Sequence, residues 1–245
     1  MPGLVLMLLL LLAPSAVPAP LSDGESRYEV RYKWGVVDTK VANASFVISD
    51  GEWNGKAVKH SQISVRATPF FRLFMAEEYS VSLYLTKDGH KPLYTYAPIK
   101  KKGKEVNFYV LYNYQSGRVE AKTVSEQETL ERDFSLEDNS MDLAMFLYYM
   151  QGLNLSALNT GDSFPVQLVM PRTVAPVMIN YEGLDTEKIP GVTTRRFFIN
   201  FTDRGLMEDM SGKAVHVWIS ADDAQQVLLL TVPLKNGVMA ASLVR

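Results

Sequence analysis

The chain has 245 residues, of which 47% are hydrophobic and 21% are charged, and its net charge is -2 at pH 7. This composition is typical of a folded globular protein and argues against wholesale disorder. Proteins that bind nucleic acid usually carry a basic face, so we expect no nucleic-acid partner. The chain has no cysteine, which excludes a disulfide framework, thiolate metal sites and a thiol nucleophile.

The N-terminal segment has the pattern of an export signal. An apolar run of residues 4–13 is followed by proline and small residues up to Ala19. Such a run is too short to span a membrane, which needs about 20 residues. We expect residues 1–19 to be a signal peptide, cleaved after Ala19 or, alternatively, after Ser15. A buried N-terminal strand or helix is the competing interpretation. A cysteine-free exported chain is more typical of a bacterial envelope than of an animal extracellular fluid.

Alternation of apolar and polar residues predicts strands in the first half of the chain. From residue 27 to residue 34 every second side chain is apolar, which is the pattern of a half-buried strand. The pattern recurs in segments 42–48, 63–67 and 106–114. Turn sequences separate these segments: Asp50-Gly51, Lys87-Asp88-Gly89, Lys102-Gly103-Lys104 and Ser116-Gly117. Since antiparallel neighbours need only short connections, we expect a meander.

The second half repeats this organisation. Strand candidates are segments 164–170, 177–181, 195–201, 213–220, 226–233 and 238–244. Asn236-Gly237 predicts a hairpin turn between the last two, because both residue types tolerate a positive φ. Segment 69–78 is expected to form a short helical turn, with Pro69 at its first position. The acidic segment 123–138 is expected to be an exposed linker or a second short helix.

Segment 140–152 predicts a short helix that is apolar on nearly every side and must therefore be buried. Ser140 is its expected N-cap and Gly152 its expected end. We expect one mainly β domain over residues 20–245, with halves 27–135 and 160–245 joined through this helix. The expected architecture is an antiparallel meander that forms a strongly curved sheet or open barrel, packed around one central apolar helix.

A curved sheet around an apolar helix suggests a binding site for an apolar ligand. The candidate lining residues lie on the helix segment and include adaptable methionine side chains. They are Met141, Met145, Phe146, Tyr149 and Met150. The alternative is that the same side chains are pure core.

The sequence contains no catalytic or metal-binding motif, so we expect no enzyme, no metal and no cofactor. His60, His90 and His216 lie far apart, and Asp222-Asp223 is expected to form a turn. The lysine-rich segment 100–104 is the expected tip of a hairpin. A set of tyrosines could line a sugar-binding face, although strand pairing explains them without a ligand. The set is Tyr94, Tyr96, Tyr109, Tyr112 and Tyr114.

Two stretches carry a resemblance to a known family. Segment 142–150 (DLAMFLYYM), followed by Leu153 and Gly161-Asp162, resembles the middle signature of the bacterial exported family known as domain of unknown function 3108. Segment 217–220 (VWIS) and the Asp222-Asp223 pair are similar to its C-terminal part. The likeness covers most of the chain after Arg27. The chain differs from the family at Gln151, where an Arg often stands, and in lacking a Pro after Asp223.

The resemblance implies a mainly antiparallel β protein exported to a Gram-negative periplasm or outer membrane, with no established activity. Its layout is similar to that of periplasmic lipoprotein carriers, which is an analogy of fold alone. We expect a monomeric, non-enzymatic envelope protein that binds a lipid or other apolar or amphipathic ligand. A structural or interaction module that docks an envelope protein is the second hypothesis, and an enzyme acting on glycans is the third.

Overall fold

The computed structural model describes residues 23–73, 78–101, 103–170, 173–201 and 214–244. The predicted signal peptide, residues 1–19, lies outside the described residues. The first eight strands are β1 (Gly24–Trp34), β2 (Val37–Trp53), β3 (Lys56–Ala67), β4 (Glu78–Leu85), β5 (Pro92–Lys101), β6 (Lys104–Asn113), β7 (Arg118–Val124) and β8 (Thr129–Ser135). The later strands are β9 (Ser140–Met141), β10 (Ser163–Met170), β11 (Thr173–Asp185), β12 (Thr194–Phe201), β13 (Val215–Ser220), β14 (Val227–Leu234) and β15 (Gly237–Leu243). Among the described residues, the helical elements are α2 (Leu143–Gly152) and two short 3-10 helices, η1 (Phe71–Leu73) and η2 (Leu155–Ala157).

The described strands form one sheet in the order β8-β7-β6-β5-β4-β3-β2-β1-β15-β14-β13-β12-β11-β10-β9. The predicted meander is confirmed, because neighbours in sequence are antiparallel neighbours in the sheet from β1 to β8 and from β10 to β15. The two runs meet where β1 pairs antiparallel with β15, with Tyr28 opposite Leu243. The short strand β9 is parallel to β10.

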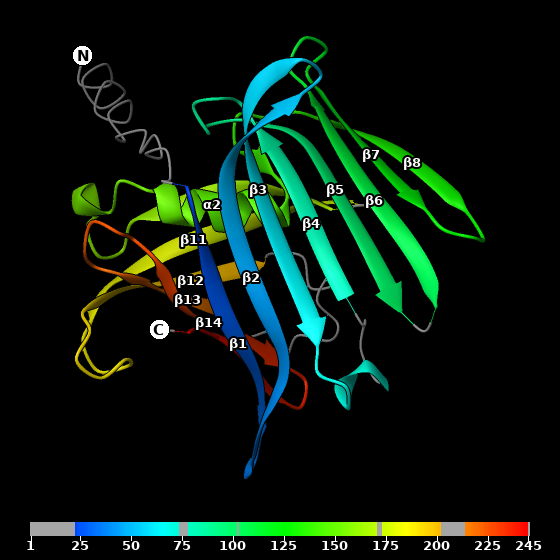
Figure 1. Cartoon of the computed structure of the whole chain (residues 1–245). Helices are drawn as coiled ribbons and strands as arrows, with labels where there is room; N and C mark the ends of the chain where they lie inside the picture. The colour runs from blue at the N-terminus through cyan, green and yellow to red at the C-terminus, as the bar shows by residue number, and fades with distance from the viewer. Residues whose placement is uncertain (1–22, 74–77, 102, 171–172, 202–213, 245) are drawn as a thin grey trace, which may run out of the picture.

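The sheet is strongly curved, so that β1–β8 form one wall and β10–β15 face them with α2 in between (Figure 1). The edges of the sheet, β8 and β9, are joined by residues 136–139 alone. Near these edges Val110 and Val119 of one wall share an apolar cluster with Val169 of the other. The predicted strongly curved sheet is therefore confirmed, and its walls approach each other in the manner of an open barrel.

Helix α2 is buried in the concave side of this sheet. It packs against β3 and β4 on one wall and against β10 on the other. Tyr148, Met150 and the following Leu153 are fully buried. Among the described residues no helix is long and apolar enough to cross a membrane.

The predicted end of this helix at Gly152 is confirmed, but its predicted start was wrong by one short element. Ser140 is not the N-cap, because Ser140 and Met141 pair with Gln167 and Leu168 as strand β9. Asp142 is the N-cap, and its side chain accepts a hydrogen bond from the Met145 amide. The C-cap is Leu153, whose non-helical ψ of 140° ends the helix after Gly152.

The prediction for segment 123–138 was also wrong, because the segment contains strand β8. Leu130 and Phe134 of β8 are half-buried, whereas the residues between them are exposed. The charged residues pair across to β7, where Lys122 contacts Glu131 at 2.8 Å. β8 is an edge strand, and edge strands often carry charged residues. Its sequence therefore shows little of the apolar alternation that marks a strand.

Two turns differ from their predicted positions. Asp50-Gly51 lies inside β2, and the β2–β3 turn is Asn54-Gly55, with φ angles of 49° and 73°. Asn-Gly is the preferred pair where both residues need a positive φ. The predicted pairing of the last two strands is confirmed, but their turn consists of residues 235–236, with Gly237 already in β15.

Candidate ligand-binding cavity

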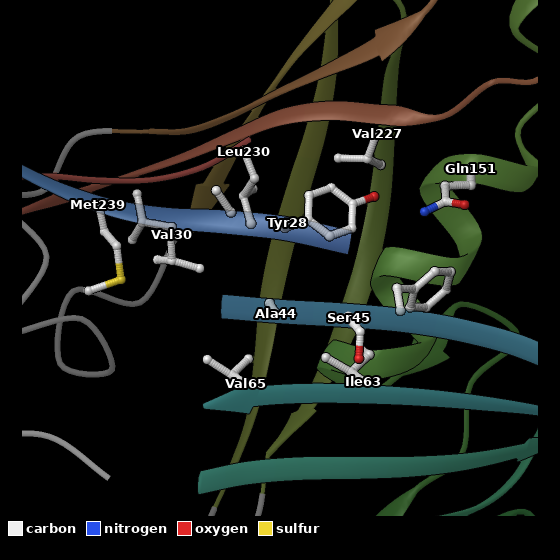
Figure 2. A pocket seen from close by; sticks show the side chains of 13 residues that line it. Tyr28, Val30, Ala44, Ser45, Ile63, Val65, Gln151, Val227, Leu230 and Met239 are labelled. Atoms are coloured by element: carbon white, nitrogen blue, oxygen red, sulfur yellow. The ribbon is translucent and has the colours of Figure 1, made fainter. Parts of the chain in front are cut away.

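A cavity of about 230 Å³ lies in the concave side of the sheet, between the central strands and the end of α2. Figure 2 shows the side chains that surround it. They come from β1, β2, β3, β14 and β15, and from Gln151 of α2. The lining residues are Tyr28, Val30, Ala44, Ser45, Phe46, Ile63, Val65, Gln151, Val227, Leu230, Val232, Met239 and Ala241.

The strand register explains why space remains here. Side chains that are paired across neighbouring strands lie on the same face of the sheet. One row runs from Tyr28 through Ala44 to Val65, and its middle position is an alanine. A second row runs from Val30 through Ala241 to Leu230, again with alanine in the middle. Because Ala44 and Ala241 carry single methyl groups where their neighbours are larger, the concave face is hollow at this place.

The lining is almost entirely apolar. Among the lining residues that the structure describes, none is Asp, Glu, Lys, Arg or His. Burial raises the pKa of Tyr28 to about 12, so this hydroxyl stays protonated and neutral at physiological pH. The cavity therefore offers an apolar surface with no formal charge.

Gln151 is the polar group that α2 contributes to this cavity. Its side chain extends from the last turn of α2 toward the lining residues (Figure 2). Within the described part of the chain, its side-chain amide takes part in no hydrogen bond. Its backbone carbonyl, with that of Leu153, accepts from the Gln225 amide nitrogen at 3.2 and 2.8 Å. The end of the helix is thus tied to the β13–β14 turn while the Gln151 side chain stays available to a ligand.

The residues that the sequence suggested as lining lie elsewhere in the same core. Met141, Met145, Phe146 and Met150 are buried in the main apolar cluster, and Tyr149 packs against it. None of the five borders the 230 Å³ cavity. Their role in ligand binding stays a prediction that the structure does not test.

Three of these residues border a second, smaller hollow of about 190 Å³ between the ends of β5 and β10. Met141, Met145 and Tyr149 meet His90 and Lys91 there. The Nδ1 atom of His90 is buried, and no hydrogen-bond partner for it lies among the described residues. This hollow mixes polar and apolar walls, so it differs in chemistry from the larger cavity.

A third, open hollow is lined by charged side chains of the β11–β12 hairpin. Glu182 is paired with Arg196 at 2.6 Å, and Asp185 accepts from the Trp218 indole nitrogen at 2.9 Å. The Trp218 bond, with the backbone amides of Lys188 and Glu187, lowers the pKa of Asp185. A general acid needs a raised pKa, so Asp185 is better suited to supporting the hairpin than to acid catalysis.

The other sequence candidates are dispersed. No group of three or more potential metal ligands occurs among the described residues. Asp222 and Asp223 lie in the β13–β14 turn as predicted, and the Ser220 hydroxyl donates to Asp222 at 2.6 Å. Of the five tyrosines, Tyr112 is buried on the inner face and its hydroxyl donates to Asp142 at 3.1 Å.

Tyr94, Tyr96 and Tyr109 lie on the outer face of the sheet, where they extend an aromatic stripe. Tyr96 stacks on Tyr109 with ring centroids 5.1 Å apart, and Tyr94 stacks on Trp53 at 5.9 Å. The stripe, which we call the outer aromatic stripe, consists of Trp53, His60, Tyr84, Tyr94, Tyr96 and Tyr109.

The fold and the cavity define an open-barrel-like β protein with an apolar cavity on the concave side of its sheet. The chain belongs to the family described as "Protein of unknown function (DUF3108)", whose model matches residues 27–244. This match confirms the resemblance seen in the sequence. No curated protein matches the chain.

The fold is similar to a crystal structure described as a beta-barrel-like protein of domain of unknown function DUF1849 from Brucella abortus. The TM-score is 0.57 at 11% sequence identity, with 93% of this chain and 98% of that chain covered. At this identity the likeness shows a shared fold and carries no information about function.

Proposed function

We propose that this protein binds a small apolar or amphipathic ligand, without chemical conversion, in the 230 Å³ cavity. The observation that supports the proposal is the cavity's lining, which is apolar apart from Tyr28, Ser45 and Gln151. Empty cavities of this kind cost stability, and an apolar cavity of roughly 150 Å³ holds one benzene molecule. The volume suits one alkyl chain or ring better than a drug-sized ligand, whose pockets begin at roughly 300 Å³.

The proposal includes a cellular location. We infer export by residues 1–19 to the periplasm or outer membrane of a Gram-negative bacterium, as a monomer with an envelope role related by analogy to lipoprotein carriers. The pattern of residues 1–19 supports this inference, as does the resemblance of the sequence to a family of bacterial exported proteins. Cell fractionation with mass measurement of the mature N-terminus tests it. A full-length chain in the cytoplasm would contradict it.

A cavity-filling substitution tests ligand binding directly. Ala44→Phe places a ring between Tyr28 and Val65, and we expect it to weaken binding of the neutral fluorescent probe N-phenylnaphthylamine by about tenfold or more. Asn43→Phe is the matched control, because Asn43 is exposed on the opposite face of the same strand. We expect the control to bind like the wild type. Circular dichroism establishes that both variants are folded.

The proposal fails if the probe does not bind the wild-type protein, or if folded Ala44→Phe binds it equally well.

The second candidate function, docking of a partner protein, would then be favoured. The outer aromatic stripe presents partly exposed rings on the convex face, for example His60 stacked on Tyr84 at 4.7 Å. Aromatic side chains are enriched in protein interfaces, so this face suits docking of an envelope protein.

A further inference from the structure

The charge of the cavity wall restricts the ligands it can accept. Ten of the 13 lining residues are Val, Ile, Leu, Met, Ala or Phe, and the other three are uncharged. A charged group moved from water into such surroundings loses favourable hydration unless a counter-charge or several hydrogen bonds replace it. None of the described lining residues supplies a counter-charge of either sign.

The Gln151 side chain marks one end of the cavity. Gln151 and Met239 lie at opposite ends of the group of lining side chains, and the Tyr28 ring lies between them (Figure 2). The Gln151 amide has both donors and an acceptor, and it has no hydrogen-bond partner within the described part of the chain. An alkyl chain would lie along Val30, Val65 and Met239, with its polar end at Gln151.

We propose, on the basis of the proposed function, that the ligand is a neutral amphiphile with a single alkyl chain and an uncharged hydrogen-bonding head group that meets Gln151. Hydroxyl, ester and amide head groups fit this description. Carboxylates, phosphates and ammonium groups do not fit it, because they would lose hydrating water in the cavity and meet no opposite charge among the described lining residues.

The experiment compares two probes of equal chain length, decanol and decanoate at neutral pH, by displacement of N-phenylnaphthylamine from the full chain. We expect decanol to displace the probe at a concentration at least about tenfold lower than decanoate. Decanol and decanoate also differ in water solubility, and this difference is the same for every variant. The change in the decanol-to-decanoate preference between the wild type and a variant therefore reports the head-group contact alone. Gln151→Lys puts a cation at the head-group position, and we expect it to shift the decanol-to-decanoate preference about tenfold toward decanoate.

Gln62→Lys is the matched control, since it adds the same charge on the exposed outer face of β3. We expect it to keep the wild-type preference. An unchanged preference in Gln151→Lys, or wild-type protein that binds decanoate as well as decanol, overturns the neutral-ligand inference while leaving the proposed function intact. Failure of the naphthylamine probe itself to bind overturns the proposed function instead. Thermal unfolding of each variant separates loss of binding from loss of fold.

Discussion

Asp142 is a fully buried carboxyl group at the start of α2, and both of its oxygens are hydrogen-bonded. Oδ1 accepts from the Met145 amide at 2.9 Å, which caps the helix. Oδ2 accepts from the hydroxyls of Thr95 on β5 and Tyr112 on β6. One side chain therefore joins the helix start to two strands of the facing wall.

The stability of the protein should depend on pH through this residue. Burial raises the pKa of Asp142 above its usual range, although the bonds from Thr95, Met145 and Tyr112 act in the opposite direction. The native state thus holds this proton more tightly than the unfolded chain does. Its stabilising effect is complete below the unfolded pKa of about 4 and is lost as pH rises through the native pKa.

We therefore expect the free energy of unfolding of wild type, measured relative to Asp142→Asn, to fall as the pH is raised from about 4. Asn keeps a capping oxygen and cannot ionise, so it is the appropriate reference. Urea unfolding at a series of pH values measures both proteins. A difference that is constant with pH, or that grows as pH rises, would contradict the raised pKa.

Gly89 occupies a place where no side chain fits. Its φ is 76°, and a Cβ atom there would lie 2.2 Å from the Tyr148 hydroxyl of α2. We expect Gly89→Ala to lower the free energy of unfolding by about 2–4 kcal/mol, through strain plus displacement of a buried ring. Gly117→Ala, at φ 65° with open space around it, should cost only about 1 kcal/mol. Equal costs would show that the Tyr148 contact is unimportant.

At the scale of the element, α2 is stabilised mainly by the burial of its side chains against the sheet. It has only ten residues, and isolated helices below about 12–15 residues are marginal in water. Its side chains are buried by β3, β4 and β10, so the sheet supplies most of its stability.

Truncation of Phe146 measures how firmly the helix is packed. Phe146 is 5% exposed and belongs to the main core cluster, so we expect Phe146→Ala to cost about 3–5 kcal/mol by leaving a cavity. Tyr149→Phe, at a half-buried position of the same helix, should cost much less. Denaturant unfolding provides the comparison. A loss below about 1 kcal/mol for Phe146→Ala would identify α2 as a mobile lid.

Strands with one buried face were predictable from sequence, and strands at the edge were not. In β1, for example, apolar residues alternate from Tyr28 to Trp34, and Tyr28 and Val30 of this series are buried in the core. β8 has half-buried Leu130 and Phe134 set among charged residues, which resembles a linker. The N-terminus of α2 was misplaced because two residues, Ser140 and Met141, pair with a strand that follows later in the chain.

At the scale of the whole molecule, the apolar helix and the curved sheet were predictable, but the position of the cavity was not. Its walls bring together β1–β3 and β14–β15, which are separated by well over a hundred residues. Local periodicity shows that Ala44 points inward, yet only the register shows that it lies between Tyr28 and Val65. Alanines at inward positions of long strands are the available sequence signal, and it is a weak one.

The pairing of β1 with β15 sets the order in which the protein can be completed. Among the described strands β1 comes first in the chain and β15 last, so a chain that emerges N-terminus first, from the ribosome or through the export machinery, leaves β1 with an unpaired edge until nearly all of the described chain has emerged. Until then, the half-formed cavity faces solvent, and its apolar side chains are open to wrong partners. Closing so distant a contact is entropically slow, so the nascent chain has a long interval in which chaperone protection matters.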